Sequence, residues 1–405
     1  MTDVSRVRVA GPLGQFAAGF AAELVGQGYA VQPAAQQLRL LAHVSRWLAA
    51  AGKHAGALNA VTVEAFVVSR RAAGYSNHLT VDALRPLLAY LRALGVIAEQ
   101  DVPVPSGPVA VALERYRQYL LVERGVSAIT ARVYVDAVRP LLAGRVSRDG
   151  RRLDLWGLRA GDVVAFVVGH CPALSRAAAK QTTTALRSLL VYLHVVGEVA
   201  RPLAGAVPSV AGWRLVGLPR GLEPDQVQAL LASCDRDSTN GCRDFAILAM
   251  LVRLGLRAGE VAALSLDDVN WRAGEIMVRG KGDRRERLPL PTDVGEAVSV
   301  YLRDRRPASA QERSLFVRVQ APLGPLTSSA VSSIVAAAGR RAGLGSIGAH
   351  RLRHTVATEM LRAGASLPEI GQVLRHRHMS TTAIYAKTDR EALREIARPW
   401  PGGRA

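Results

Sequence analysis

A short stretch near the C-terminal end of the sequence holds most of the side chains that could do chemistry. The group consists of His350, Arg353, His354, Arg375, His376, Arg377, His378 and Tyr385. Arginine and imidazole groups can bind the oxygens of an anion, and a tyrosine hydroxyl can act as a nucleophile. This set therefore predicts an anion site that faces a nucleophile.

The elements that must position these groups can be read from the same stretch. The spacing of apolar residues predicts a helix over 350–363, which places its first histidine and Arg353 one turn apart on one face. A capping-box pattern at 366–369 predicts a second helix that ends near His376. Ser380 can cap a third helix over 381–387, and that helix would carry the tyrosine.

Composition indicates the kind of partner. The chain has 405 residues and a formal net charge of +19, so we expect a polyanionic partner, most simply nucleic acid. A merely basic surface would give the same charge. At this length two or three domains are expected. Nearly all the basic residues are arginine, and lysine occurs only at positions 53, 180, 281 and 387.

Cysteine usage and hydropathy indicate the compartment. Cys171, Cys234 and Cys242 are odd in number and lack C-x-x-C spacing, so neither a disulfide framework nor a zinc ribbon is indicated. The sequence shows no leader pattern and no uncharged stretch of about 18 apolar residues. We therefore expect a cytoplasmic protein with no membrane partner, no cofactor and no metal.

The first half of the sequence contains an internal repeat. Residues 83–91 recur in close form as residues 185–193, and residues 65–68 recur as residues 165–168. This order predicts two copies of one helical unit, an N-terminal domain over 1–100 and a second domain over 109–200, separated by a proline-rich segment. Chance similarity between alanine-rich helices is the alternative.

The second half has a different pattern. After a predicted linker over 201–221, the patterns indicate a domain over 222–398 and a tail over 399–405. Two strands, 274–279 and 285–290, are predicted to form a hairpin. The predicted helices before and after this hairpin cover 223–234, 242–254, 293–304 and 327–342. The C-terminal domain is thus expected to be mostly helical with a small antiparallel sheet.

Several short motifs of this domain occur in a recognisable order. They are Gly255-Leu256-Arg257-Ala258-Gly259-Glu260, the hairpin residue Lys281, His350-Arg351-Leu352-Arg353, Leu374-Arg375-His376 and Tyr385. Together they resemble the tyrosine recombinase (phage integrase) family over residues 220–390, and residues 109–200 resemble its core-binding domain. The resemblance implies a mainly α fold, with tandem helical SAM-like core-binding domains followed by a mixed α/β catalytic domain.

The sequence departs from the family in two places. The additional copy over residues 10–98 is one departure, because many members carry a single core-binding domain. The other is Arg375, where the family often has glycine before the histidine. A bulky cation there could disturb the approach of His376 to a phosphate, or add a contact to DNA.

The resemblance also implies a set of catalytic residues, namely Arg257, Lys281, His350, Arg353, His376 and Tyr385. The two arginines would clamp the scissile phosphate, with His376 as a third donor. Tyr385 would attack to form a 3′-phosphotyrosyl intermediate, and His350 would handle the tyrosine proton.

The remaining two implied roles concern the leaving group and the orientation of the site. Lys281 would protonate the departing 5′ oxygen, since the pKa of an amine can be lowered into a useful range and that of a guanidinium cannot. Glu260, one turn from the first arginine, would orient groups of the site. A plain intrahelical ion pair is the alternative for Glu260.

Other interpretations of the same residues remain. His350 and His354, at i and i+4, could bind zinc, but the residues between them lack the glutamate of a metalloprotease helix. Asp267 and Asp268 could be half of a magnesium site. Tyr385 could be a buried core tyrosine of an amphipathic helix.

The predicted function is site-specific recombination of double-stranded DNA, in integration, excision or resolution for a mobile element or plasmid. As the resemblance implies, four protomers on two sites would exchange strands through a Holliday junction, and an accessory directionality factor is a further candidate partner. A type IB topoisomerase-like enzyme and a non-catalytic DNA-binding protein are the alternatives.

Overall fold

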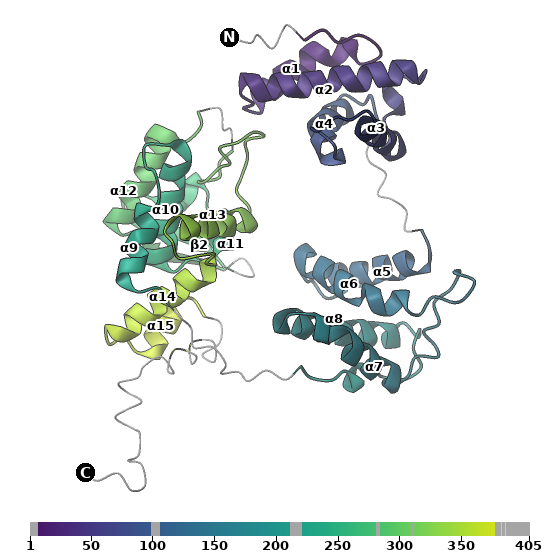
Figure 1. Cartoon of the computed structure of the whole chain (residues 1–405). Coiled ribbons are helices and arrows are strands. Elements are labelled where there is room, and N and C mark those ends of the chain that lie inside the picture. The colour runs from purple at the N-terminus through teal and green to yellow at the C-terminus, as the bar shows by residue number, and fades with distance from the viewer. Residues whose placement is uncertain are drawn as a thin grey trace. The chain divides into compact units, whose positions relative to one another are not determined.

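The computed structural model describes residues 7–98, 106–210, 221–280, 284–308 and 312–376, together with Thr382 and Tyr385. One compact unit comprises residues 100–216, and the other comprises residues 1–99 with 217–405. In these described parts the chain is mainly helical, with one three-stranded antiparallel sheet (Figure 1). The predicted fold class is confirmed at this level.

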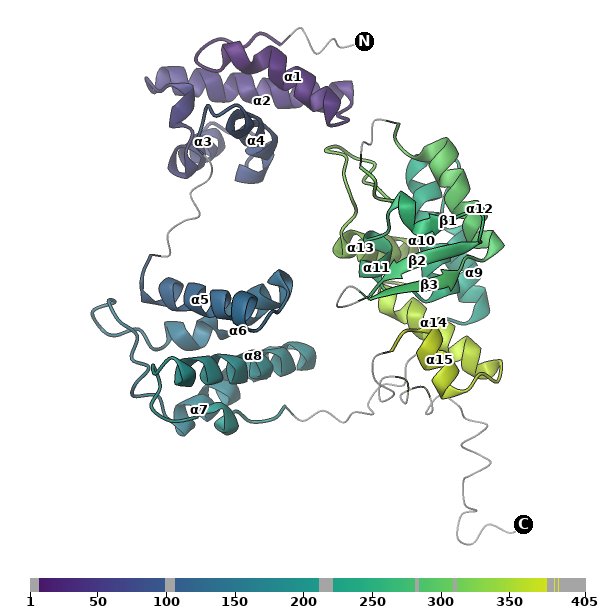
Figure 2. The same ribbon diagram turned by 180° about the vertical axis from the view of Figure 1, so that it is seen from behind.

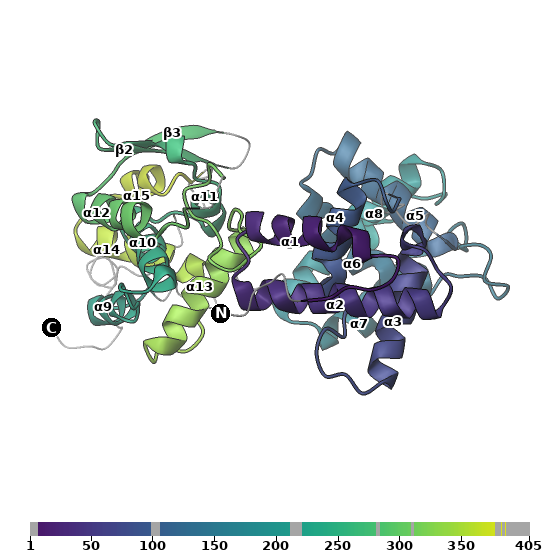
Figure 3. The ribbon, with the colours of Figure 1, turned by 90° about the horizontal axis from the view of Figure 1, so that it is seen from above.

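The N-terminal residues build a helical unit around their own core. Its helices are α1 (Ala17–Gly26), α2 (Val31–Ala50), α3 (Ala60–Ala72) and α4 (Arg85–Ala93). The helices α1 and α2 lie side by side (Figure 3). Leucines from α2 and α4, such as Leu41 and Leu91, are fully buried together with Phe20. Burial of apolar side chains at helical spacing is what holds such a unit together.

The second helical unit has the same number of main helices. They are α5 (Pro108–Gln118), α6 (Ala128–Ala143), α7 (Ala160–His170) and α8 (Arg176–Val195). Leu203 and Val207, predicted to belong to a linker, are buried in this core, and Arg187 donates to the carbonyls of Val207 and Pro208. The chain up to Pro208 is therefore part of the second unit, because its apolar side chains are covered.

Seven helices build the C-terminal part. They are α9 (Pro224–Ala232), α10 (Thr239–Leu254), α11 (Ala258–Ala262), α12 (Thr292–Val300), α13 (Ser328–Arg341), α14 (Ala349–Arg362) and α15 (Leu367–Val373), counted over the described residues. The central helix is α10, in which 12 of 16 residues are buried. It packs against α12 and α14. Gly255 ends α10 in the left-handed conformation, with φ of 58°, as its position after the helix predicts.

A small sheet lies on one side of this helical core. Strands β1 (Val269–Asn270), β2 (Glu275–Arg279) and β3 (Arg285–Pro289) pair antiparallel in that order (Figure 2). Ile276 and Val278 of β2 are fully buried while their neighbours are not, which is the alternation that predicts a half-buried strand. The hairpin prediction is confirmed. The two residues of β1 are too few to give a periodic signal.

The elements around the predicted site are where local signals place them. The helix predicted over 350–363 is α14, and the predicted capping box is present at α15, where the backbone N–H of Ser366 donates to Glu369 Oε2 at 2.7 Å. Of the helix predicted over 381–387, all but Thr382 and Tyr385 lies outside the described residues. Over the described range, none of the helices is both long and apolar enough to cross a membrane.

Candidate active site

A cleft in the C-terminal part is lined by several of the predicted site residues. It encloses about 640 Å³ and is lined by Arg257, Glu260, Arg279, Gly280, Ser328, Ser332, Gly348, His350 and Arg353, among others. Arg257 and Glu260 come from the start of α11, and the histidine and second arginine come from the first turn of α14. The cleft therefore brings together groups almost 100 residues apart in sequence, and its cations come from the start of α11, from β2 and from α14.

Arg353 is the buried cation of the cleft. Its side chain is among the largest that are fully buried, with 1% of its surface exposed. Nη1 donates to the carbonyl of Gly255 at 2.6 Å, and Nη2 donates to the carbonyl of Leu374. Burial, with nearby cations, lowers the pKa of Arg353 to about 10, so the group stays charged at neutral pH. Two of its five N–H groups are used, which leaves others for an anion.

Arg257 is a partly exposed cation of the cleft, and a buried carboxylate holds it. Its side chain is 44% exposed, and Nη1 lies 2.5 Å from Glu260 Oε1. Glu260 Oε2 also accepts from the backbone N–H of Arg257 at 2.9 Å, and from Arg375 Nη2 at 2.9 Å. Burial raises the pKa of Glu260, but the charges and hydrogen bonds of the two arginines more than offset this and lower it overall.

The predicted nucleophile contacts a histidine that the sequence interpretation did not assign to it. The Tyr385 hydroxyl lies 2.7 Å from Nδ1 of His354, while His350 stacks edge-on against His354 with ring centroids 4.3 Å apart. Burial, followed by the charges of His350 and Arg353, lowers the pKa of His354 to about 4. His354 is therefore neutral at neutral pH, and a neutral imidazole can accept a proton.

Tyr385 is covered by apolar side chains. Its side chain is 1% exposed and packs with Val356 and Ala357 of α14 and with Ile370 and Leu374. Burial raises the pKa of Tyr385, and the charge of Arg353 offsets this only in part. Such burial is expected of a tyrosine in a hydrophobic core. The contact of its hydroxyl with His354, which stacks on His350, is an additional feature that packing alone does not require.

The ring of His376 also lies near Tyr385. Its ring is parallel to that of Tyr385, at 5° with centroids 6.3 Å apart, and its Nδ1 is 2.8 Å from Thr382 Oγ1. Burial, followed by the charges of Arg353 and Arg257, lowers the pKa of His376 to about 4. His376 is thus a neutral hydrogen-bonding group near Tyr385.

The cleft contains Arg257, Glu260, His350 and Arg353, while Tyr385 packs against α14 and His376 lies near Tyr385. Lys281 lies outside the described residues, although Gly280 before it lines the cleft. Sequence reasoning did not assign His354 to the tyrosine. The sequence did indicate that His354 lies near His350, because residues four positions apart share one face of a helix.

The metal interpretations find little support. Asp267 pairs with Arg313, and Asp268 pairs with Arg279 at 3.1 Å while accepting from Ser265. Each aspartate is thus neutralised by a guanidinium. In the described part of the chain, no group of three or more histidine, cysteine or acidic residues could hold a metal ion.

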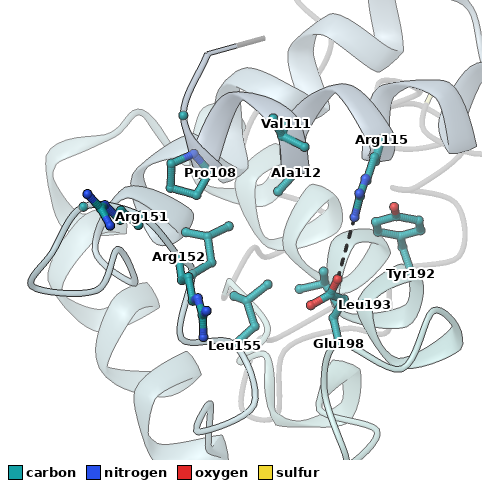
Figure 4. A pocket seen from close by; sticks show the side chains of 13 residues that line it. Pro108, Val111, Ala112, Arg115, Arg151, Arg152, Leu155, Tyr192, Leu193 and Glu198 are labelled. Atoms are coloured by element: carbon teal, nitrogen blue, oxygen red, sulfur yellow. Dashed lines mark ion pairs between the residues drawn. The ribbon is translucent and has the colours of Figure 1, made fainter.

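A second hollow, in the helical unit of residues 106–210, has a different character. It encloses about 700 Å³ and is lined mainly by apolar side chains such as Pro108, Val111 and Leu193 (Figure 4). At one end Arg115 and Glu198 approach to 4.0 Å. Its lining also contains Tyr192, Arg151 and Arg152.

The C-terminal part thus combines a helical domain and a small sheet with a cleft lined by Arg257, Arg279 and Arg353, an arrangement suited to binding a phosphate group. Residues 220–392 match the model of the Phage integrase family. The chain is 44% identical over 398 residues to the integrase/recombinase y4rA of Sinorhizobium fredii, covering 97% of this chain and 95% of that protein.

Two further relatives extend the comparison. Tyrosine recombinase XerC of Haemophilus influenzae is 31% identical over 293 residues, or 70% of this chain and 95% of that protein. The crystal structure of XerH site-specific recombinase bound to a palindromic difH substrate matches 84% of this chain and 95% of that chain, with a TM-score of 0.56 and 19% identity. The chain belongs to the phage integrase family and is a tyrosine-type site-specific recombinase that cleaves and rejoins DNA.

Proposed function

We propose that Tyr385 is the nucleophile of this recombinase and that His354 receives its proton. The 2.7 Å contact between the Tyr385 hydroxyl and His354 Nδ1, on the helix whose first turn lines the cleft, carries this proposal. Because the hydroxyl is buried, attack requires this contact to open toward the cleft. A neutral histidine at the hydroxyl is suited to act as a general base at that moment.

The remaining residues receive the roles that the family resemblance implies. Arg257 and Arg353 bind the non-bridging oxygens of the scissile phosphate, and His376 donates to it. Two arginines at one phosphate stabilise the charge that develops in the transition state. His350, stacked on the proton acceptor, supports it. These assignments agree with the lining of the cleft by Arg257, His350 and Arg353.

In the proposed reaction the phosphoryl group is transferred from the 5′ oxygen of the DNA to the oxygen of Tyr385. The Tyr385 oxygen bonds to phosphorus, the bond from phosphorus to the 5′ oxygen breaks, and the tyrosine proton passes to His354. The departing 5′ oxygen takes a proton from Lys281, whose chain neighbour Gly280 lines the cleft. A 5′ hydroxyl of a second strand then reverses these steps, which joins new partners without loss of bond energy.

The test uses nicked suicide duplexes made from the flanks of the gene's own element. We expect an SDS-resistant protein–DNA adduct with the wild type and none with Tyr385→Phe, while both proteins bind the duplex in a gel-shift assay. An adduct formed by Tyr385→Phe would move the nucleophile to another residue. Recombinant products, as opposed to religation in cis, would separate strand exchange from topoisomerase activity.

The tandem core-binding domains belong to the same proposal. Gly95 after α4 and Gly197 after α8 both have positive φ, and each donates to the carbonyl three residues before it. The leucines at matching positions of the two helices, Leu88 and Leu190, are both buried. The XerC relative matches only 70% of this chain with 95% of its own length, so this chain is longer. A duplicated helical unit accounts for these features.

The assembly and its setting remain proposals as well. The crystal structures of lambda integrase and XerH are described as complexes with DNA sites, the former as a dimer on a core site. We propose that this chain forms a tetramer on two sites, passes through a Holliday junction and acts in the cytoplasm. Light scattering with site DNA tests the tetramer, and a complex that stays at one protomer per site would contradict it.

A further inference from the structure

Arg375 has a backbone conformation that suits glycine. Its φ is 55°, and only His78 shares a positive φ with it among the described residues that are not glycine. In this left-handed region a side chain of an L-residue crowds the following carbonyl oxygen. A residue other than glycine or asparagine at such a position indicates that its side chain has a compensating contact.

The side chain of Arg375 is turned into the protein. Only 5% of its surface is exposed, and it is not among the side chains that line the cleft. Nη2 donates to Glu260 Oε2 at 2.9 Å, and Nη1 donates to the carbonyl of Val373 at 3.1 Å. Its buried Nε has no hydrogen-bond partner. Arg375 is thus placed as an internal counter-ion, and an exposed contact to DNA does not fit this burial.

Arg375 contacts the carboxylate of Glu260, which also binds Arg257 of the cleft. Glu260 is 4% exposed and binds Arg257 through both its side chain and its backbone N–H. Arg257 lines the cleft, and Arg375 does not. The three residues form a chain in which a buried guanidinium, 115 residues later in sequence, stabilises the carboxylate that orients a cleft guanidinium.

We propose that Arg375 is a positioning residue, which keeps the Glu260 carboxylate charged and in place so that Glu260 holds Arg257 toward the scissile phosphate. A carboxylate buried this deeply is costly without a paired cation. Arg257 alone would stabilise the Glu260 carboxylate less, because the guanidinium of Arg257 also contacts water and, during the reaction, a phosphate. This proposal rests on the role proposed above for Arg257.

The charged groups around Glu260 come from three elements. Over the described residues they are Arg257 at the start of α11, Arg353 of α14 and Arg375 after α15. The same cleft is also lined by Arg279 of β2, which pairs with Asp268, by His350 of α14, and by uncharged Ser328 and Ser332 of α13. Removal of Arg375 leaves the effect of burial less opposed, so the pKa of Glu260 rises. The Glu260 carboxylate would then become protonated as the pH falls, and its ion pair with Arg257 would weaken at acidic pH.

The test compares Arg375→Gly and Arg375→Lys with the wild type in adduct formation on the suicide duplex between pH 6 and 8.5. Glycine suits the positive φ, so Arg375→Gly is expected to fold, which thermal unfolding checks. We expect Arg375→Gly to cleave at least tenfold more slowly at pH 6, with a smaller deficit at pH 8.5. Arg375→Lys should recover part of the cleavage rate and should show a smaller dependence of that rate on pH than Arg375→Gly.

A double-mutant cycle separates positioning from a general effect on stability. With Glu260→Gln the carboxylate charge is already absent, so adding Arg375→Gly should cause little further loss of rate. Wild-type rates for Arg375→Gly at every pH, or additive losses in the double variant, would overturn the proposal. Tyr385→Phe, run alongside, reports separately on the proposed nucleophile.

An independent observation points to a second site, in the N-terminal helical unit. A small pocket of about 250 Å³ lies between the segment before α1 and the middle of α2. It is lined by Val7, Arg8, Ala10, Arg39, Ala42, His43 and Arg46. Within the described ranges, the three arginines form no ion pair with a carboxylate. The pocket is therefore a concave surface with cations and no acid in its lining.

The second helical unit also has a hollow on its own second helix. In α6 the lining residues Arg132, Val135, Asp136 and Arg139 have the same spacing as Arg39, Ala42, His43 and Arg46 in α2. There Arg139 lies 3.8 Å from Asp136. Within this spacing the N-terminal pocket has His43 where the second hollow has Asp136, so the arginines of the N-terminal pocket are left available for an external anion.

We infer that Arg8, Arg39, His43 and Arg46 bind a backbone phosphate of duplex DNA. Arg46 Nη2 lies 3.2 Å from His43 Nδ1, which orients the guanidinium within the pocket. Guanidinium groups fork onto phosphate oxygens, and each phosphate that a protein neutralises adds to the salt dependence of binding. The N-terminal unit would thereby extend the contact of the recombinase along DNA.

The test measures the affinity of the full chain for a 60-base-pair duplex over a series of salt concentrations. Arg39→Ala with Arg46→Ala should weaken binding and reduce the slope of log K against log salt by about 0.9 for one lost phosphate contact. Lys53→Ala with Arg85→Ala removes the same formal charge from exposed positions of the same unit as the control. Equal slopes for the two double variants would overturn the site.

Discussion

Replacement of His354 by asparagine tests the proposed proton transfer most directly. The asparagine amide can occupy the place of Nδ1 and keep a hydrogen bond to the Tyr385 hydroxyl, but it cannot accept a proton at neutral pH. The hydroxyl contact is 2.7 Å in the wild type. The substitution therefore removes basicity and leaves the contact largely in place.

The structure sets the expected size of the effect. At its usual pKa of about 10, a tyrosine is ionised in roughly one of 300 molecules at pH 7.5. Burial raises the pKa of Tyr385, so even fewer hydroxyls are ionised without help. A positioned general base contributes about 10²- to 10⁴-fold. Loss of hydrogen-bond geometry alone would cost about 0.5 to 1.5 kcal/mol, or roughly 2- to 13-fold.

The assay is single-turnover formation of the SDS-resistant adduct on a nicked suicide duplex at saturating protein and pH 7.5. We expect His354→Asn to reduce this rate by at least about 100-fold while the affinity for the duplex stays unchanged. His54→Asn, at an exposed histidine of the N-terminal unit, is the matched control and should behave as the wild type. A His354→Asn rate within tenfold of the wild type would refute a base at this position.

Three further predictions concern the support of the cleft. Gly255→Ala should lower stability by about 1–2 kcal/mol, measured by chemical unfolding, because φ is +58° and the new Cβ would lie 2.7 Å from Cδ2 of Leu374. Arg353→Lys should cost about 1–3 kcal/mol in the same experiment, since one ammonium replaces a fork that serves two buried carbonyls, and equal stability would contradict this. Because folding lowers the pKa of the Glu260 carboxyl, the ionised carboxylate stabilises the fold above its unfolded pKa, and this stabilisation is lost as the pH falls through its folded pKa. Glu260→Gln should therefore reduce the dependence of the free energy of unfolding on pH between pH 2 and 6, measured by urea titrations. An unchanged pH dependence would contradict this prediction.

Much of the local structure was predictable because its signals are local. The capping box at Ser366, the stop at Gly255 and the hairpin of β2 and β3 each depend on residues within a few positions of one another. Hydrogen bonds within one turn determine where a helix begins, and a left-handed glycine determines where it ends. The order of the motifs along the chain likewise allowed the family and the candidate residues to be named.

The interpretation of the linker shows where local signals mislead. Residues 201–208 carry prolines and a glycine, which favour a loop, but Leu203 and Val207 are buried against the second helical unit. Burial depends on which apolar surface the segment meets, and composition does not contain that information. A proline- or glycine-rich segment is therefore irregular in conformation without being detached from the core.

What the sequence determined by itself is the set of elements, their order and the reactive residues that they carry. The tertiary structure decided which groups meet: Arg353 with the carbonyls of Gly255 and Leu374, the Tyr385 hydroxyl with His354, and Arg375 with Glu260. These contacts join residues 21 to 115 positions apart. Helical periodicity gives the face on which a side chain lies, but only the packing of one helix on another determines the atom that faces it.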